Sequence, residues 1–354
     1  MKKIRILFMS LVDSTNLNAQ SLNTREIVLR LDANRFECSL FYGHQPDPRL
    51  LNHSHIRLLR LPAHLKTARL LREMLSGYDI IAYMDYSPAS YLLLHCPKLL
   101  RRHTKTVRHV EGPPKLGNEP LLLKFLYHGT VSRCDVYTAI TERTAQDFSS
   151  VFHREVLSIL PVGVDHHNFL LPRNIKEGAL SVLFVGTVTE RKRPLLVLEA
   201  AVRFPHVKFR IIGPDRYGYE QVVRQRIAEL NVNNVVIEGA KSQEAIACAM
   251  QESDVFLLPS VLEGLPKVTL EAAACGMPCI VFRDYETPSV VDGLTGFQVD
   301  TIDEMMEKLG LLLENARLRE NMGIAARDLA QKFDWDYVAQ LWQDAYLKIA
   351  STRA

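Results

Sequence analysis

The chain of 354 residues is long enough for two domains, and its 47% hydrophobic and 23% charged residues are typical of globular proteins rather than disordered ones. No run of 18 apolar residues occurs, so we expect no membrane-spanning helix. The six cysteines form no Cys-x-x-Cys pair, which argues against a zinc site or a disulfide framework and favours a reducing cytoplasm.

Charge is unevenly distributed along the chain. Residues 1–172 contain 22 basic and 15 acidic side chains, a net charge of +7, whereas the remaining residues carry −4. The basic half could face anionic lipid, a phosphorylated acceptor or nucleic acid, or its excess could be only a solvated surface. A basic segment with helical periodicity fits either a peripheral membrane contact or an ordinary surface helix; it contains Arg57, Arg60, Lys66, Arg69 and Arg72.

Short apolar runs alternate with longer segments of helical period, which predicts an α/β fold of parallel strands covered by helices. The apolar run at the start of the chain is interrupted by Arg5, so we interpret it as a first buried strand rather than a secretory signal. The predicted strands are, in chain order, Ile4–Met9, Glu37–Tyr42, Ile56–Leu59, Ile80–Met84, Thr106–Val110, Val136–Ile140, Val156–Ile159, Ser181–Val185, Lys208–Ile212, Val235–Glu238, Val255–Leu258, Cys279–Phe282 and Gly296–Val299.

A polar, turn-rich stretch at Leu171–Leu180 separates two such series and predicts an interdomain linker. We therefore expect Rossmann-like domains at residues 1–172 and 173–332. The last segment, residues 333–354, contains an amphipathic helix at Trp335–Ile349 that must pack against another element. Two doubly wound domains place the carboxyl ends of their strands toward a crevice, where ligands bind.

The segment from Pro259 to Pro278 carries the strongest signal in the chain. A strand ends before it, a turn forms around Glu263 and Gly264, and a helix carries Glu271 before it stops at Gly276. The free amides at the start of this helix suit a diphosphate, and a carboxylate in the same cleft suits a ribose diol. Spaced glutamates on a helix usually form only a solvated face, but the apolar neighbours of Glu271 make a bound polar ligand the better explanation.

This segment resembles the E-x7-E signature of the retaining family 4 glycosyltransferases, also called glycosyl transferases group 1. Other short motifs of that family follow in the same order and cover most of the chain: Gly163–Asp165, Val185–Gly186 with Lys192, Ile212–Gly213, Ile237–Gly239, Asp292–Gly296 and Phe333–Trp335. In the first half the resemblance is looser and rests on Tyr78–Ile81 and on Val107–His109. A histidine at a strand end is often only structural. The place of His109 in this ordered series of motifs nevertheless makes it a candidate catalytic group.

The resemblance implies a GT-B fold, with an acceptor-binding first domain, a second domain that binds a nucleotide-sugar donor, and a C-terminal helix that crosses back to the first domain. Glu263 and Lys192 would act in catalysis, and Glu271 would hold the ribose. The donor would also contact Gly264, Leu265, Lys267, Val268 and Thr187, with Lys241 near the base. The implied enzyme is a hexosyltransferase that retains the anomeric configuration and requires no metal or other cofactor.

Two positions depart from the family pattern. Thr187 stands where an arginine is usual, and we expect Arg191 to supply the second charge for the phosphates. The first loop, residues 13–21, contains none of the glycines that bring the backbone close to the donor; Asn16 or Ser21 could substitute, or the loop could recognise the acceptor.

The acceptor could be a glycan, a lipid-linked molecule or a small molecule. The first two would place the enzyme in polysaccharide or glycolipid biosynthesis. The main alternative is a noncatalytic GT-B scaffold that binds nucleotides, which both departures would suit. An epimerase of the same architecture lacks the paired glutamates in this context, and a nucleic-acid binder is suggested by the basic half alone. We therefore expect a cytoplasmic glycosyltransferase, peripheral on a membrane at most, that binds no nucleic acid.

Overall fold

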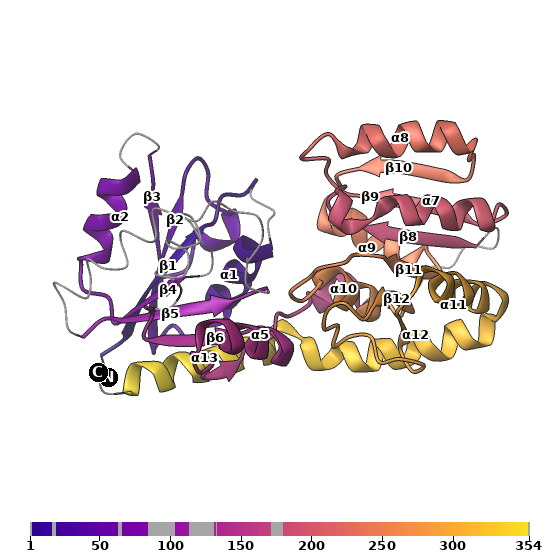
Figure 1. Cartoon of the computed structure of the whole chain (residues 1–354). Coiled ribbons are helices and arrows are strands. Elements are labelled where there is room, and N and C mark those ends of the chain that lie inside the picture. The colour runs from indigo at the N-terminus through magenta and orange to yellow at the C-terminus, as the bar shows by residue number, and fades with distance from the viewer. Residues whose placement is uncertain are drawn as a thin grey trace. The chain divides into compact units, whose positions relative to one another are not determined.

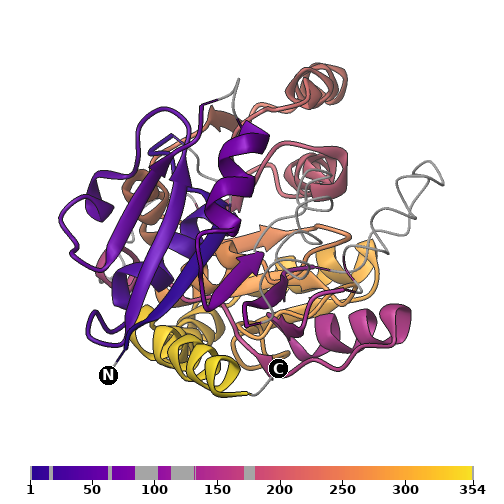
Figure 2. The same ribbon diagram turned by 90° about the vertical axis from the view of Figure 1, so that its left-hand side faces the viewer.

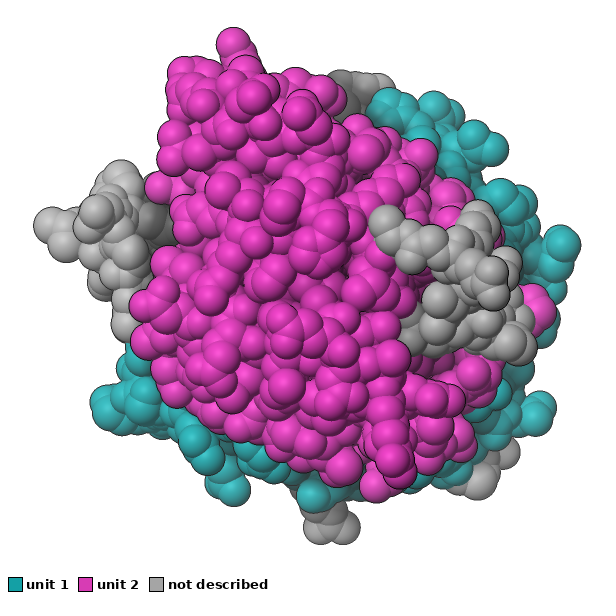
Figure 3. Space-filling view, turned by 90° about the vertical axis from the view of Figure 1, so that its right-hand side faces the viewer, with its two compact units in different colours: residues 1–162, 335–354 teal, residues 163–334 magenta. Residues whose placement is uncertain are grey.

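The computed structural model describes residues 2–15, 19–62, 66–83, 103–112, 131, 133–170 and 180–352. The chain divides into two compact units, which Figure 3 colours separately. The first unit comprises residues Met1–Val162 and Trp335–Ala354, and the second comprises Gly163–Asp334. The second unit thus begins at Gly163 rather than at residue 173, because helix α6 (His166–Phe169) packs against helices α9 and α10 of that unit. Most of the predicted linker, residues 171–179, lies outside the described residues.

A parallel sheet forms the centre of the first unit. Its strands are β1 (Ile4–Leu11), β2 (Phe36–Tyr42), β3 (Ile56–Arg60), β4 (Ile80–Tyr83), β5 (Lys105–Val110), β6 (Val136–Ala139) and β7 (Ser158–Ile159). Among the described residues they lie in the order β3-β2-β1-β4-β5-β6-β7, and every neighbouring pair is parallel. Helices cover both faces of such a sheet, so successive side chains of a central strand are buried and apolar. In β1, for example, Ile6, Leu7 and Phe8 are all completely buried.

The helices of this unit are α1 (Ala19–Arg30), α2 (Lys66–Met74), α5 (Glu142–Phe152) and α13 (Trp335–Ser351), with a 3-10 turn η1 (Pro48–Leu50). The C-terminal helix α13 lies against α1 (Figure 1, Figure 2). Arg30 Nε donates to Asp336 over 2.6 Å, and the indole Nε1 of Trp342 donates to the carbonyl of Pro161 over 3.0 Å. The amphipathic stripe of α13 is therefore buried in the first unit, although it follows the second unit in sequence.

The second unit contains another parallel sheet. Its strands are β8 (Ser181–Val185), β9 (Lys208–Ile212), β10 (Val235–Gly239), β11 (Val255–Leu258), β12 (Cys279–Phe282) and β13 (Gly296–Val299). Their order within the described residues is β10-β9-β8-β11-β12-β13, so the direction of winding reverses between β8 and β11. Each sheet is thus doubly wound, which confirms two Rossmann-like domains of the GT-B class.

The helical elements of the second unit are α6, η3 (Glu190–Lys192), α7 (Pro194–Arg203), α8 (Tyr219–Leu230), α9 (Gln243–Gln251), α10 (Lys267–Ala274), α11 (Ile302–Glu314), α12 (Ala316–Ala330) and η4 (Gln331–Phe333). The loops after β8 and β9 approach so closely that a Cβ on Gly213 would lie 1.9 Å from the carbonyl oxygen of Gly186. Gly186 and Gly213, each part of a family motif in the sequence, therefore allow the two backbones to pack closely. Among the described helices, none is long and apolar enough to cross a bilayer.

Candidate functional site

The candidate site lies where the winding of the second sheet reverses. The chain leaves β8 and β11 in opposite directions, so the loops at the carboxyl ends of these neighbouring strands diverge and leave room for a ligand. Two contacts hold the loops together. Val261 N donates to the carbonyl of Arg191 over 3.2 Å, and the Arg191 guanidinium donates to the carbonyl of Leu262. The loop after β8 and the turn before α10 therefore form one surface.

Two of the predicted catalytic residues meet on this surface. Lys192 Nζ lies 2.6 Å from Glu263 Oε1, and their side chains are only 11% and 10% exposed. Arg191 NH1 lies 3.1 Å from the same carboxylate oxygen, but its side chain is 46% exposed. Burial by itself would raise the pKa of Glu263, yet the charges of Lys192 and Arg191 outweigh burial and lower it. Glu263 is thus held as a carboxylate between two cations.

Helix α10 begins directly after this turn. Its N-cap is Pro266, and no side chain caps the first turn. The Thr269 hydroxyl donates to the carbonyl of Pro266 over 2.7 Å and accepts from the Ser289 hydroxyl over 2.8 Å. These bonds tie the first turn of α10 to the loop that contains Ser289. A helix N-terminus without a capping side chain presents backbone donors and the positive end of the helix dipole to an anion.

Glu271 lies on the same helix and is only 6% exposed. Among the described residues its carboxylate has no hydrogen-bond or ion-pair partner within bonding distance. Burial raises its pKa, the nearby charge of Asp165 adds to that effect, and Lys267 opposes it. A buried carboxylate without a partner is costly, so this group is suited to a ligand that brings hydroxyl donors.

The other predicted donor-binding residues are spread around this centre. Gly264, Leu265 and Val268 are partly exposed in the turn and at the start of α10, and Thr187 is partly exposed after β8. Lys241 is exposed beyond β10, where its Nζ lies 3.7 Å from Glu238. The structure therefore joins Arg191, Lys192 and Glu263 by direct contacts, but it shows no such contact between Lys241 and them.

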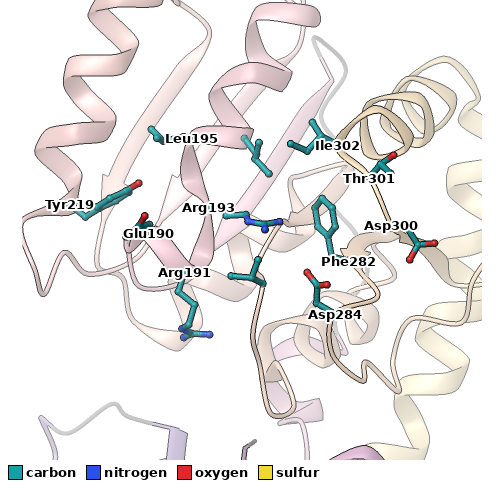
Figure 4. A pocket seen from close by; sticks show the side chains of 12 residues that line it. Glu190, Arg191, Arg193, Leu195, Tyr219, Phe282, Asp284, Asp300, Thr301 and Ile302 are labelled. Atoms are coloured by element: carbon teal, nitrogen blue, oxygen red, sulfur yellow. The ribbon is translucent and has the colours of Figure 1, made fainter. Parts of the chain in front are cut away.

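An open groove of about 870 Å³ adjoins the site (Figure 4). Arg191 and Val261 line it together with residues at the ends of β12 and β13, among them Phe282, Asp284 and Thr301. The guanidinium of Arg193 lies 5.3 Å from the centre of the Phe282 ring. The sequence analysis does not single out Phe282 or Asp284. The only signal for them is their place at the end of β12 and just beyond it, next to β11.

His109 lies in the first unit, 1% exposed. Its Nδ1 is 2.5 Å from the Thr138 hydroxyl, its Nε2 is 2.9 Å from the Tyr346 hydroxyl, and its ring lies 4.6 Å from that of Trp342. Burial, with the nearby charge of Arg108, lowers its pKa to about 3. Both ring nitrogens are thus engaged inside the unit, and the catalytic role of His109 stays a prediction.

The first loop is anchored by a carboxylate rather than shaped by glycines. Asp13 accepts hydrogen bonds from three successive amides beyond β2, those of Gly43, His44 and Gln45, over 2.6 to 3.1 Å. The Ser21 hydroxyl donates to the carbonyl of Leu11 over 2.6 Å, which ties α1 to β1. Asn16 lies outside the described residues. Among the residues that the structure describes, no group of three histidine, cysteine or acidic side chains is arranged to hold a metal ion.

Comparison with known proteins agrees with this geometry. The family model described as "Glycosyl transferases group 1" matches residues 171–329, and the model described as "Glycosyltransferase Family 4" matches residues 23–168. The two matches fall on the two halves of the chain, and both belong to the same class of transferase. The chain therefore carries one domain of each of these two glycosyltransferase families.

Curated relatives match over part of their length. A D-inositol 3-phosphate glycosyltransferase of Kribbella flavida is 30% identical over 51% of this chain and 46% of its own, and the sulfoquinovosyl transferase SQD2 of Arabidopsis thaliana is 28% identical over 44% and 30%. The match thus spans less than half the length of these relatives.

Solved structures match over the whole chain. Anabaena HepE in complex with UDP and glucose superposes with a TM-score of 0.81 at 17% identity, covering 98% of this chain and 100% of that one. A sucrose-phosphate synthase of Thermosynechococcus elongatus gives a TM-score of 0.80 at 17% identity, covering 98% and 99%. At this level of identity the likeness establishes the GT-B fold.

Proposed function

We propose that this protein transfers a sugar from a nucleotide-diphosphate-sugar donor, bound by the second unit, to an acceptor. The observation that carries the proposal is the convergence of Lys192, Arg191 and Glu263 beside the uncapped start of α10, the helix that also carries the unpartnered Glu271. Cations, free helix amides and a buried carboxylate match the diphosphate and the hydroxyls of such a donor.

The diphosphate would be neutralised by protein groups. Lys192 and Arg191 would supply positive charge, and Arg191 would take the role of the arginine that the family usually has at position 187. The amides of Leu265, Lys267 and Val268 would add the positive end of the helix dipole. As the bond between sugar and phosphate breaks, negative charge grows on the leaving diphosphate, and preorganised cations stabilise it. No metal would then be required, which an EDTA-treated sample would test by keeping its activity.

The sugar and the ribose would each meet one glutamate. Glu271 would accept hydrogen bonds from the ribose diol and so obtain the partners it lacks. Glu263 would accept hydrogen bonds from the donor sugar and stabilise positive charge that develops on the ring. Retention of the anomeric configuration follows from the family pattern, and nuclear magnetic resonance of the product linkage would test it.

The acceptor, whether a glycan, a lipid-linked sugar or a small molecule, would bind to the first unit. Arg60 and Arg72 are exposed there and form no ion pair with any described residue, whereas Arg57 and Arg69 lie 3.9 and 3.3 Å from the buried Glu73. The apolar residues Leu70 and Met74 of α2 are buried in the core. A peripheral contact of this surface with anionic lipid would therefore be electrostatic, without insertion of α2.

A thermal-shift panel of UDP-, GDP- and ADP-sugars, with magnesium or with EDTA, tests the donor proposal. A ligand that binds only the folded protein raises its melting temperature. We expect a shift by one donor class that persists in EDTA and is lost in Glu271→Gln. If no nucleotide sugar shifts the melting temperature, the transferase proposal is wrong; binding without turnover would favour the noncatalytic scaffold, which the absence of arginine at position 187 suits.

A further inference from the structure

The two cations assigned to the diphosphate already share an anion within the protein. Lys192 Nζ lies 2.6 Å and Arg191 NH1 lies 3.1 Å from one and the same atom, Oε1 of Glu263. Within the part of the chain that the structure describes, these are the only cations paired with Glu263. The carboxylate thus occupies the position in which both cations would otherwise receive a phosphate oxygen.

Burial makes this pairing energetically important. The Lys192 and Glu263 side chains are about nine-tenths buried, so water screens their attraction weakly. Removing one partner from such a pair leaves an uncompensated buried charge, which is strongly destabilising. A diphosphate that takes Lys192 from Glu263 must therefore leave that carboxylate in need of new partners.

We propose that Glu263 is an internal counter-ion of the diphosphate subsite, and that donor binding exchanges it for the diphosphate and frees it to bind the donor sugar. This inference rests on the proposed function. A nucleotide sugar supplies both the replacement anion for Lys192 and hydroxyl groups for the released Glu263. A nucleoside diphosphate without a sugar supplies only the anion, so the displaced carboxylate stays unpaired.

The exchange makes the site prefer an intact donor to the spent nucleotide. While the sugar is attached, the diphosphate and Glu263 each have a partner. After transfer the hydroxyl groups depart, and Glu263 competes with the remaining nucleoside diphosphate for Lys192 and Arg191. The ion pair therefore favours release of the product nucleotide.

Isothermal titration with three probes tests this exchange: UDP, UDP-glucose and inorganic pyrophosphate, which lacks the base and the ribose. In Glu263→Gln we expect UDP and pyrophosphate to bind at least roughly fivefold tighter than in the wild type, the lower end of the usual coupling between two sites. UDP-glucose should gain less, because the glutamine binds the sugar less well. The preference for UDP-glucose over UDP should therefore fall.

Glu73→Gln is the matched control, because it also removes a buried, arginine-paired carboxylate but lies in the first unit. Its affinities should equal those of the wild type. If Glu263→Gln does not fold, Glu263→Asp withdraws the carboxylate from Lys192 and should change UDP affinity in the same direction by a smaller factor.

The outcomes separate the exchange from the proposed function. If the wild type binds UDP-glucose but Glu263→Gln binds UDP and pyrophosphate no more tightly, the exchange is wrong and the transferase proposal stands. If the wild type binds no nucleotide sugar of any base, both are wrong.

Discussion

The imidazole Nε2 of His109 lies 2.9 Å from the hydroxyl oxygen of Tyr346. This contact joins β5, near the middle of the first sheet, to α13, the helix at the end of the chain. The opposite ring nitrogen bonds to Thr138 on β6. A neutral, buried histidine thus fastens the C-terminal helix to the sheet of the first unit.

Stability should fall in acid because of His109. Burial lowers its pKa to about 3, whereas an unfolded histidine titrates near 6.5. The unfolded chain therefore takes up this proton first, so the contribution is complete above pH 6.5 and is lost as pH falls from 6.5 toward 3, by on the order of 5 kcal/mol. Urea unfolding of the wild type and His109→Gln across this range checks it. An equal acid dependence in both proteins would contradict the assignment.

Several strands could be predicted from the sequence because they are buried on both faces. The bounds of β8, β11 and β12, which are buried at every position, match the predicted runs, since continuous burial gives continuous apolar runs. The bounds of β9 and β13 also match, although Lys208 is exposed and Gln298 is only partly buried. The edge strand β7 begins at Ser158 instead of Val156, because it pairs with one neighbour over only two residues. The position of Gly163 in the second unit depends on packing between helices, which leaves no mark in local sequence.

The site could be predicted only in part. Lys192, Glu263 and Glu271 stand out by family spacing, but the bond between Lys192 and Glu263 depends on the adjacency of β8 and β11, which are far apart in the chain. The amides that hold Asp13 belong to ordinary loop residues after β2, and a backbone donor carries no sequence signature.

Glu271→Gln should stabilise the empty protein while it weakens nucleotide binding. Burial raises the pKa of this carboxyl, so the ionised group opposes folding, and this effect grows as pH rises above the unfolded pKa of about 4.3. A neutral amide of the same shape removes a desolvation cost of about 1–3 kcal/mol at pH 8. Urea unfolding at pH 8 measures the gain, and titration with UDP measures the binding. A loss of stability together with unchanged binding would place Glu271 in the structural framework.

Lys192→Ala should reduce turnover far more than Arg191→Ala. Lys192 is buried against Glu263, whereas the Arg191 side chain is 46% exposed. Loss of the buried cation should lower kcat by about 10²–10³, as expected for one preorganised electrostatic group. Loss of the exposed Arg191 guanidinium should lower kcat less than loss of Lys192. It should also lower the free energy of unfolding by no more than about 1 kcal/mol. Steady-state kinetics with the donor identified by thermal shift compares the two, with melting temperatures as the folding control. A larger effect of Arg191→Ala would make Arg191 the principal phosphate cation.

Gly213→Ala should destabilise the second unit, whereas Gly310→Ala should not. A Cβ on Gly213 would lie 1.9 Å from the backbone oxygen of Gly186, and the φ of +154° also disfavours a side chain. Backbone cannot yield as a flexible side chain can, so the loop after β8 must move, at a cost of about 1–3 kcal/mol or more. At Gly310, inside α11, the new methyl group would only touch the Phe204 ring at 3.5 Å, and alanine favours the helix by about 1 kcal/mol. Chemical unfolding of both variants, with UDP titration of Gly213→Ala, measures the difference. Because that loop carries Lys192, Gly213→Ala should also bind UDP more weakly, and equal stability of the two variants would show that the loops after β8 and β9 are not packed as the structure describes.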